Sequence, residues 1–127
     1  MLAVALGSSV YVWNAFDSSV KQLCELEGID NQVTSVAWSQ RGSHLCVGNR
    51  YGDTTIWDVN KGKEVRTFQG HLNRVGACSW NGNLIATGSR DRSILVRDIR
   101  AEESYQYKLL GHKQEVCGLK WSMHDEN

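Results

Sequence analysis

The stretch VTSVAWSQRGSHLCVGNRYGDTTIWD, residues 33–58, contains a small apolar strand that ends in tryptophan and a later strand that ends in Trp-Asp. Both markers recur in VGACSWNGNLIATGSRDRSILVRD, residues 75–98, where the second marker is Arg97-Asp98. The first marker appears once more as VCGLKW at 116–121, and the second appears early as Trp13-Asn14. The spacings are 44 and 40 residues in one series and 42 and 41 in the other.

A period in the low forties, with Gly-His ahead of one strand and Trp-Asp at the end of another, is typical of WD-repeat β-propeller blades. Short apolar segments alternate with turns rich in Gly, Asn, Asp and Ser, and no segment keeps a helical period. The fold class that we predict is all-β, an incomplete WD-repeat propeller. The 127 residues hold about three blades, fewer than the 4 to 8 that typically close a ring.

The repeat divides the chain without leaving a linker or a second domain. We expect the remainder of a first blade at 1–28, a second blade at 29–70, a third at 71–111 and the first strand of a fourth at 112–127. The expected strands lie at 2–6, 10–13, 20–26, 33–38, 44–47, 54–57, 64–68, 75–80, 84–87, 94–96, 105–110 and 115–121.

The charges balance, with 14 basic and 14 acidic residues, so no overall field attracts nucleic acid or an acidic membrane. Four arginines lie between residues 90 and 100, but Asp91 and Asp98 interrupt them and no aromatic residues interleave for base stacking. No run of 18 apolar residues is present. We therefore predict protein partners, no nucleic acid and no membrane.

The four cysteines, Cys24, Cys46, Cys78 and Cys117, form no Cys-x-x-Cys pair and have no histidine at zinc-ligand spacing. We interpret them as small buried apolar residues in a reducing compartment, which predicts an intracellular protein without a metal site. A Gly-rich phosphate loop is absent as well. The sequence therefore predicts no cofactor.

One blade carries the residue types of a buried polar network. His71 precedes the first strand of the third blade, Thr87 lies on the second strand, Asp91 in the following turn, and Arg97 replaces the usual tryptophan. Mutual hydrogen bonds would make a buried histidine and carboxylate tolerable. His71, Thr87 and Asp91 could also be a hydrolase triad, and Asp91→Asn would then abolish activity. The chain lacks a Gly-x-Ser-x-Gly nucleophile turn, so we expect a structural network and no enzyme.

The second blade has different residues at the matching positions. Ile29, Val47 and Tyr51 stand where the network residues stand in the third blade, and only Trp57 keeps the usual type. We therefore expect apolar packing to hold this blade together.

Several segments closely resemble the Fizzy and Fizzy-related proteins, which are WD-repeat activators of the anaphase-promoting complex, a ubiquitin ligase. The general WD pattern calls for neither EVCGLKW, residues 115–121, nor an arginine at the third-strand tryptophan. The segments are LAVAL at 2–6, RGSHL at 41–45, RVGA at 74–77, GSRDRSIL at 88–95, RDIR at 97–100 and GHKQEVCGLKW at 111–121.

This resemblance implies a seven-bladed propeller that captures degrons of cell-cycle proteins and presents them for ubiquitination in the nucleus and cytoplasm. Its implied partners are anaphase-promoting complex subunits and degron-bearing proteins, and catalysis would belong to other subunits. The destruction-box degron would place a leucine in an apolar pocket between the first and last blades, where Val4 and Val20 match lining residues. Gly7 stands where some members carry an acidic residue.

Two alternatives stay open. Val4 and Val20 could be ordinary strand core, and the chain could belong to a general WD-repeat scaffold of another complex. The family's C-box and terminal Ile-Arg tail do not occur in these residues, and its KEN-degron segment would begin just past Asn127. A C-box upstream and an Ile-Arg end downstream would decide for an activator.

Overall fold

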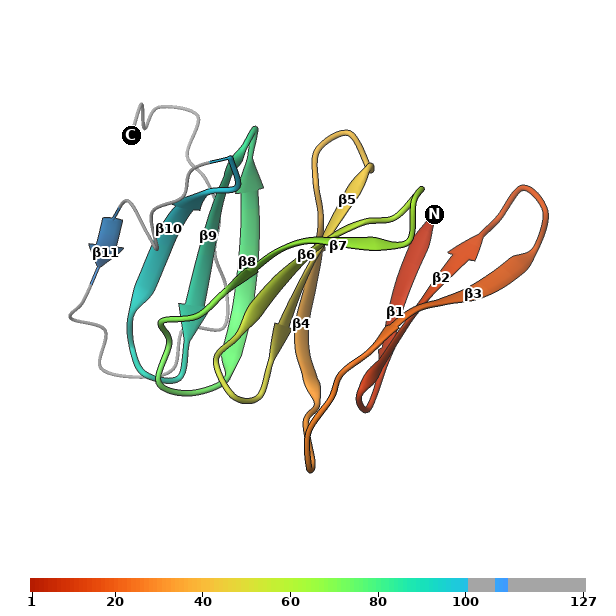
Figure 1. Cartoon of the computed structure of the whole chain (residues 1–127). Coiled ribbons are helices and arrows are strands. Elements are labelled where there is room, and N and C mark those ends of the chain that lie inside the picture. Colours follow the sequence, from red (N-terminus) through yellow and green to blue (C-terminus); the bar gives the residue numbers. More distant parts are fainter. Residues whose placement is uncertain (101–106, 110–127) are drawn as a thin grey trace.

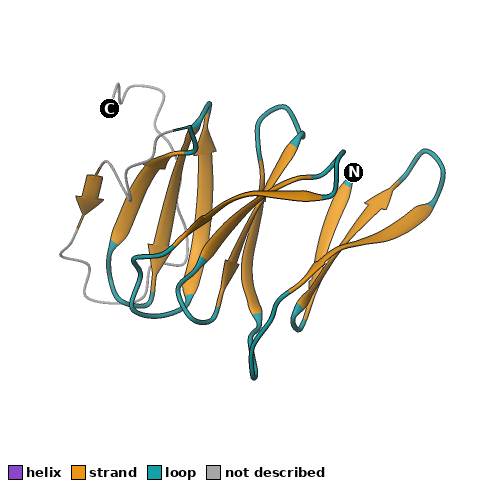
Figure 2. Ribbon diagram, in the orientation of Figure 1, coloured by secondary structure: helices purple, strands orange, loops and turns teal. Residues whose placement is uncertain are grey.

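The computed structural model describes residues 1–100 and 107–109 of the chain. In this part the chain forms strands and no helices (Figure 2), so the all-β prediction is confirmed. No helix long and apolar enough to cross a bilayer occurs among these residues. The predicted strand at 115–121 lies outside the described residues.

Each of three antiparallel sheets is a meander in which consecutive strands pair. The first sheet contains β1 (Leu2–Leu6), β2 (Ser9–Asn14) and β3 (Ser19–Glu25). The second contains β4 (Val33–Trp38), β5 (His44–Asn49), β6 (Thr54–Asp58) and β7 (Lys63–Phe68). The third contains β8 (Val75–Asn81), β9 (Leu84–Ser89), β10 (Ile94–Asp98) and β11 (Tyr107–Leu109). For β1 to β10 these bounds agree with the expected strands within two residues, whereas the ends of the strand expected at 105–110 lie outside the described residues.

The three sheets stand side by side in chain order (Figure 1). β1 contacts β4, and β4 and β5 both contact β8, so each sheet meets the next near its first strands. This arrangement is that of successive propeller blades. The limits predicted for the blades fall in the loops between sheets or outside the described residues, and they stay predictions.

Two apolar clusters fill the spaces between the sheets. The alternation of side chains along each strand sends one set of residues into each space. Burying a valine, leucine, isoleucine or phenylalanine side chain contributes roughly 1.5 to 3 kcal/mol, so the sheets depend on one another for stability. The first cluster contains Val10, Cys24, Leu45 and Val47, and the second contains Cys46, Ile56, Phe68, Trp80 and Ile85.

Hydrogen bonds also cross from the second sheet to the third. Two of the donors are side chains and one is a backbone amide. These hydrogen bonds require a particular geometry, so they fix the relative position of the two sheets in addition to the apolar packing. The pairs are Thr34 Oγ1 to Val75 O at 2.6 Å, Trp80 Nε1 to Ala37 O at 2.9 Å and Gly82 N to Gln40 Oε1 at 2.9 Å.

Candidate functional site

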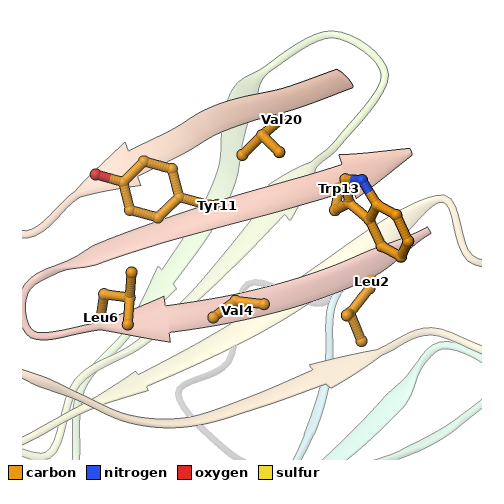
Figure 3. A pocket seen from close by; sticks show the side chains of 6 residues that line it. All are labelled: Leu2, Val4, Leu6, Tyr11, Trp13 and Val20. Atoms are coloured by element: carbon orange, nitrogen blue, oxygen red, sulfur yellow. The ribbon is translucent and has the colours of Figure 1, made fainter. Parts of the chain in front are cut away.

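An apolar hollow of about 420 Å³ lies on the face of the first sheet that points away from the second sheet. Side chains two residues apart on a strand share a face. The lining residues therefore come from alternate positions of the three strands, as Figure 3 shows. They are Leu2, Val4 and Leu6 of β1, Tyr11 and Trp13 of β2, and Val20 of β3.

The strand register gathers these side chains. Val4 pairs with Tyr11, and Trp13 pairs with both Leu2 and Val20. Val4 is 38% exposed and Val20 is 65% exposed, so neither valine belongs to the core of the described chain. A contiguous exposed apolar patch on a folded protein marks a place where something binds or packs.

The structure thus brings the two valines singled out from the sequence onto one face, and it adds four large side chains that the sequence analysis missed. The alternation of large residues with alanine in Leu2-Ala3-Val4-Ala5-Leu6 could have revealed part of this set. Gly7 lies in the tight turn after β1 with φ of +62°. The hollow can take an aliphatic side chain, and its lining supplies no charge to fix a polar group.

A second constellation lies at the start of the third sheet. His71 is 6% exposed, and its Nε2 lies 2.8 Å from the hydroxyl oxygen of Thr87. Its Nδ1 lies 3.2 Å from Asp91 Oδ2 and 3.1 Å from Ser93 Oγ. The structure therefore brings His71, Thr87 and Asp91 into one hydrogen-bonded cluster. Ser93 also belongs to it, although nothing in its spacing distinguished it from the other turn serines.

Arg97 completes this cluster from β10. It is fully buried, and its Nη1 donates to Thr87 Oγ1 at 3.3 Å while its Nη2 donates to Gln69 O at 2.5 Å. The guanidinium carbon lies 5.0 Å from the centre of the Phe68 ring, within the range of a cation–π contact. At the position of the usual tryptophan, Arg97 therefore both packs against an aromatic ring and donates hydrogen bonds.

The surroundings of His71 and Asp91 determine which of the two groups carries a proton. Burial lowers the pKa of His71, Asp91 opposes that effect, and the Arg97 charge adds to it. A neutral imidazole with its proton on Nδ1 donates to Asp91 and accepts from the Thr87 hydroxyl, whose oxygen in turn accepts from Arg97. Burial alone would raise the pKa of Asp91, but hydrogen bonds from Ser93, Leu72 and His71 outweigh it and hold the pKa at about 2.

This arrangement does not suit a hydrolase triad. Thr87 is fully buried, and its hydroxyl oxygen is shared by His71 and Arg97. A nucleophile must reach the substrate and needs an oxyanion hole beside it. Within the described residues, moreover, no group of three acidic, histidine or cysteine side chains could hold a metal ion. The cluster is suited to holding a blade together.

Apolar clusters do hold the second sheet, but of the three matching positions only Val47 takes part in them. Ile29 is 87% exposed and Tyr51 is 52% exposed, and only Val47 is buried. The Tyr51 hydroxyl donates to the Ile29 carbonyl oxygen, and both residues lie at the surface. The turn is organised instead by Asn49, whose Oδ1 accepts from the backbone amides of Tyr51 and Asp53 at 2.9 Å each.

Replacing Asp91 with alanine is expected to lower the free energy of unfolding by about 1 to 3 kcal/mol, because the Nδ1–H of His71 loses its charged acceptor in a buried site. Urea unfolding followed by tryptophan fluorescence measures the change. Asp98→Ala is the control, since that carboxylate bonds to the exposed Arg100 at 3.1 Å and such pairs contribute about 0 to 1 kcal/mol. Equal losses in the two variants would contradict the network.

Acid should weaken the fold in two stages. The pKa of His71 is lowered on folding from 6.5, and that of Asp91 is lowered from 3.8 to about 2. The unfolded chain therefore binds more protons in both ranges, and stability falls as pH falls. We expect a lower urea midpoint at about pH 5 than at about pH 7.5, and His71→Gln should lose most of that difference. A higher midpoint at the lower pH would contradict this sign.

Comparison with known proteins shows which family this chain belongs to. The model of the family described as "Anaphase-promoting complex subunit 4 WD40 domain" matches residues 4–83. The chain belongs to this WD40 family. The predicted WD-repeat architecture is thereby confirmed.

Relatives of this WD40 chain agree with the resemblance seen in the sequence. Protein FIZZY-RELATED 1 of Arabidopsis thaliana is 53% identical over 122 residues, which cover 96% of this chain and 26% of the relative. The anaphase-promoting complex subunit cdh1 of Dictyostelium discoideum is 48% identical over 124 residues. These residues cover 96% of this chain and 16% of that relative. The likeness to Fizzy-related proteins is therefore confirmed, and the chain spans about a quarter or less of these relatives.

A solved structure shows the same fold. A chain in the crystal structure of the mitotic checkpoint complex superposes with a TM-score of 0.90 and 44% identity, covering 94% of this chain and 36% of that chain.

Proposed function

We propose that this chain is part of a non-enzymatic substrate adaptor that activates the anaphase-promoting complex by binding degrons of cell-cycle proteins, in the nucleus and cytoplasm. The observation that carries the proposal is the exposed apolar hollow on the first sheet, which includes Val4 and Val20. The Fizzy-related and cdh1 relatives support it. The proposed partners are subunits of that complex and degron-bearing proteins.

The chemistry of the hollow suits the leucine of a destruction box. Its lining is aliphatic and aromatic, so it rewards burial of an apolar side chain. Burying a leucine contributes roughly 1.5 to 3 kcal/mol, which corresponds to about 10- to 150-fold in affinity. Leu6 is 63% exposed and Val20 65%, so a ligand has apolar surface to cover on two of the three strands.

The absence of catalysis is part of the proposal. The only triad-like residues of the described chain, His71, Thr87 and Asp91, are hydrogen-bonded to one another and to Ser93 or Arg97. Their polar atoms serve the fold, and in our proposal the ubiquitin transfer belongs to other subunits of the ligase.

The experiment is a substitution in the full-length protein that carries this chain. Val4→Asp should lower the affinity for a fluorescently labelled destruction-box peptide at least tenfold, because it places a charge in the hollow. The matched control is Val65→Asp, a valine of similar exposure, 44%, on β7 and outside the hollow. Fluorescence anisotropy measures the affinity, and thermal unfolding confirms that each variant is folded.

Undiminished binding by folded Val4→Asp would mean that the hollow is not the degron site. Equal loss in the Val65→Asp control would point to general disruption. If the folded unsubstituted protein binds no destruction-box peptide, the alternative of a general WD-repeat scaffold is favoured.

A further inference from the structure

The turn between β8 and β9 contains an asparagine followed by a glycine. Asn81 is the last residue of β8 and is exposed, and Gly82 follows it with φ of +59°. The dipeptide Asn-Gly occurs once in the 127 residues. Because glycine has no Cβ, its backbone nitrogen can approach the side-chain carbonyl carbon of a preceding asparagine without hindrance. This turn therefore holds the residue pair that is chemically most prone to deamidation.

The second sheet holds both neighbours of Asn81 in place. Gly82 N donates to Gln40 Oε1 at 2.9 Å, and Trp80 Nε1 donates to a backbone carbonyl of β4 at 2.9 Å. Trp80 is buried in the apolar cluster between the second and third sheets, so the backbone just before Asn81 is fixed as well. Asn81 itself pairs with Leu84 across the hairpin and is held in a strand conformation.

These contacts oppose the geometry that deamidation requires. The Gly82 nitrogen must lose its proton and approach Cγ of Asn81, so its hydrogen bond to Gln40 has to break first. The ψ angle of Asn81 must also leave the β region, in which the pairing with Leu84 holds it. The contact between the sheets thus restrains a reaction that the exposed asparagine and the following glycine favour.

We propose that Asn81 is a site of spontaneous deamidation that is controlled by the contact between the second and third sheets, with Gln40 as the restraining residue. When the contact opens, the Gly82 nitrogen loses its proton and attacks Cγ of Asn81. The side-chain nitrogen leaves as ammonia, and a five-membered succinimide forms. Water then adds to either carbonyl carbon of the ring, which leaves aspartate or isoaspartate at position 81. In sum, one water is consumed and one ammonia is released, with no oxidation or reduction.

The isoaspartate product should keep the contact open. Its backbone runs through the side-chain carbon, which adds one atom beside a turn of only two residues. A hollow of about 390 Å³ is bordered by Gln40, Trp80 and Gly82, so the lengthened turn has room to move away from the second sheet. Gly82 would then lose its acceptor, and the change would accumulate with the age of the molecule.

Asn60 provides the internal comparison. It is exposed in the turn between β6 and β7, but the next residue is Lys61, whose side chain hinders attack by its backbone nitrogen. That nitrogen donates to Asp58 Oδ1 at 3.1 Å. Since this hydrogen bond lies within one hairpin, a change at Gln40 should leave the rate of deamidation at Asn60 unchanged.

The test incubates the full-length protein that carries this chain in mildly alkaline buffer, digests it at acidic pH and follows deamidation of each asparagine by mass spectrometry. Gln40→Ala should speed the reaction at Asn81 by about 2- to 12-fold, the factor that corresponds to one net hydrogen bond. Gln40→Glu, which keeps an acceptor oxygen, should restore the slow rate. Gln22→Ala is the matched control, because Gln22 donates to Ser9 within the first sheet, and it should leave the rate unchanged.

Incubation in concentrated urea gives the rate without the sheet contact. Unfolded protein should deamidate at Asn81 at one rate whatever residue stands at position 40, and faster than any folded form. Equal rates at Asn81 in the folded unsubstituted protein and in folded Gln40→Ala would overturn the proposal. An acceleration at Asn60 as large as that at Asn81 would also overturn it, because Gln40→Ala would then act through general unfolding.

Discussion

Replacing Gly52 with alanine is expected to lower the free energy of unfolding by about 2 to 5 kcal/mol. Gly52 has φ of +92°, a backbone conformation that a side chain disfavours. An added Cβ would also lie 2.4 Å from the carbonyl oxygen of His71 and 2.8 Å from that of Asn73. Because both obstacles are backbone atoms of the loop before β8, the chain cannot yield by turning a side chain.

Gly62→Ala separates the two causes. Gly62 has φ of +64°, but nothing lies within 4 Å of an added Cβ, so this variant carries the conformational cost alone, about 1 to 2 kcal/mol. Urea unfolding of both variants beside the unsubstituted chain measures the difference. If Gly52→Ala lowers the free energy of unfolding no more than Gly62→Ala does, the β5–β6 turn and the β7–β8 loop do not lie in close contact in solution.

Arg97→Ala is expected to cost about 3 to 5 kcal/mol, because it removes a large, fully buried side chain and the hydrogen bonds that this side chain donates. The substitution leaves a cavity beside Phe68 and removes the donor that Thr87 Oγ1 and Gln69 O share. Burial lowers the pKa of Arg97 to about 10, yet the group keeps its charge at neutral pH. The loss should therefore appear at full size at about pH 7.

Arg100→Ala is the matched control for Arg97. Its side chain is 70% exposed and pairs with Asp98 at 3.1 Å, so its removal should cost at most about 1 kcal/mol. Guanidinium chloride or urea unfolding with two probes, tryptophan fluorescence and circular dichroism, measures both variants. If Arg97→Ala lowers the free energy of unfolding as little as Arg100→Ala does, the Arg97 guanidinium does not stabilise the third sheet.

The strands were predictable because their signals are local. Alternating apolar residues and turns such as Asn60-Lys61-Gly62 specify each hairpin within a few residues. The association of His71, Thr87 and Asp91 was also predictable, because the three residues stand at the positions that the WD-repeat pattern gives to a buried polar network. Their hydrogen bonds to one another follow from the need to satisfy buried polar groups.

The remainder depends on contacts between repeats or on loop conformation. Ile29 was expected inside because the repeat places a histidine there, but the β3–β4 loop carries it to the surface. The role of Arg97 could not be read from spacing, since its acceptors, Gln69 and Thr87, lie on different segments.

The hydrogen bonds between the second and third sheets bear on how such a protein can grow by duplicating a repeat. Thr34 and Trp80 donate to backbone carbonyls of Val75 and Ala37, and every repeat offers a carbonyl at such a place whatever its side chains are. A newly copied repeat would therefore find acceptors on an older neighbour before any compensating substitution. The bond to the Gln40 side chain is different, because it depends on one residue type, and divergence between copies could discard it without loosening the others.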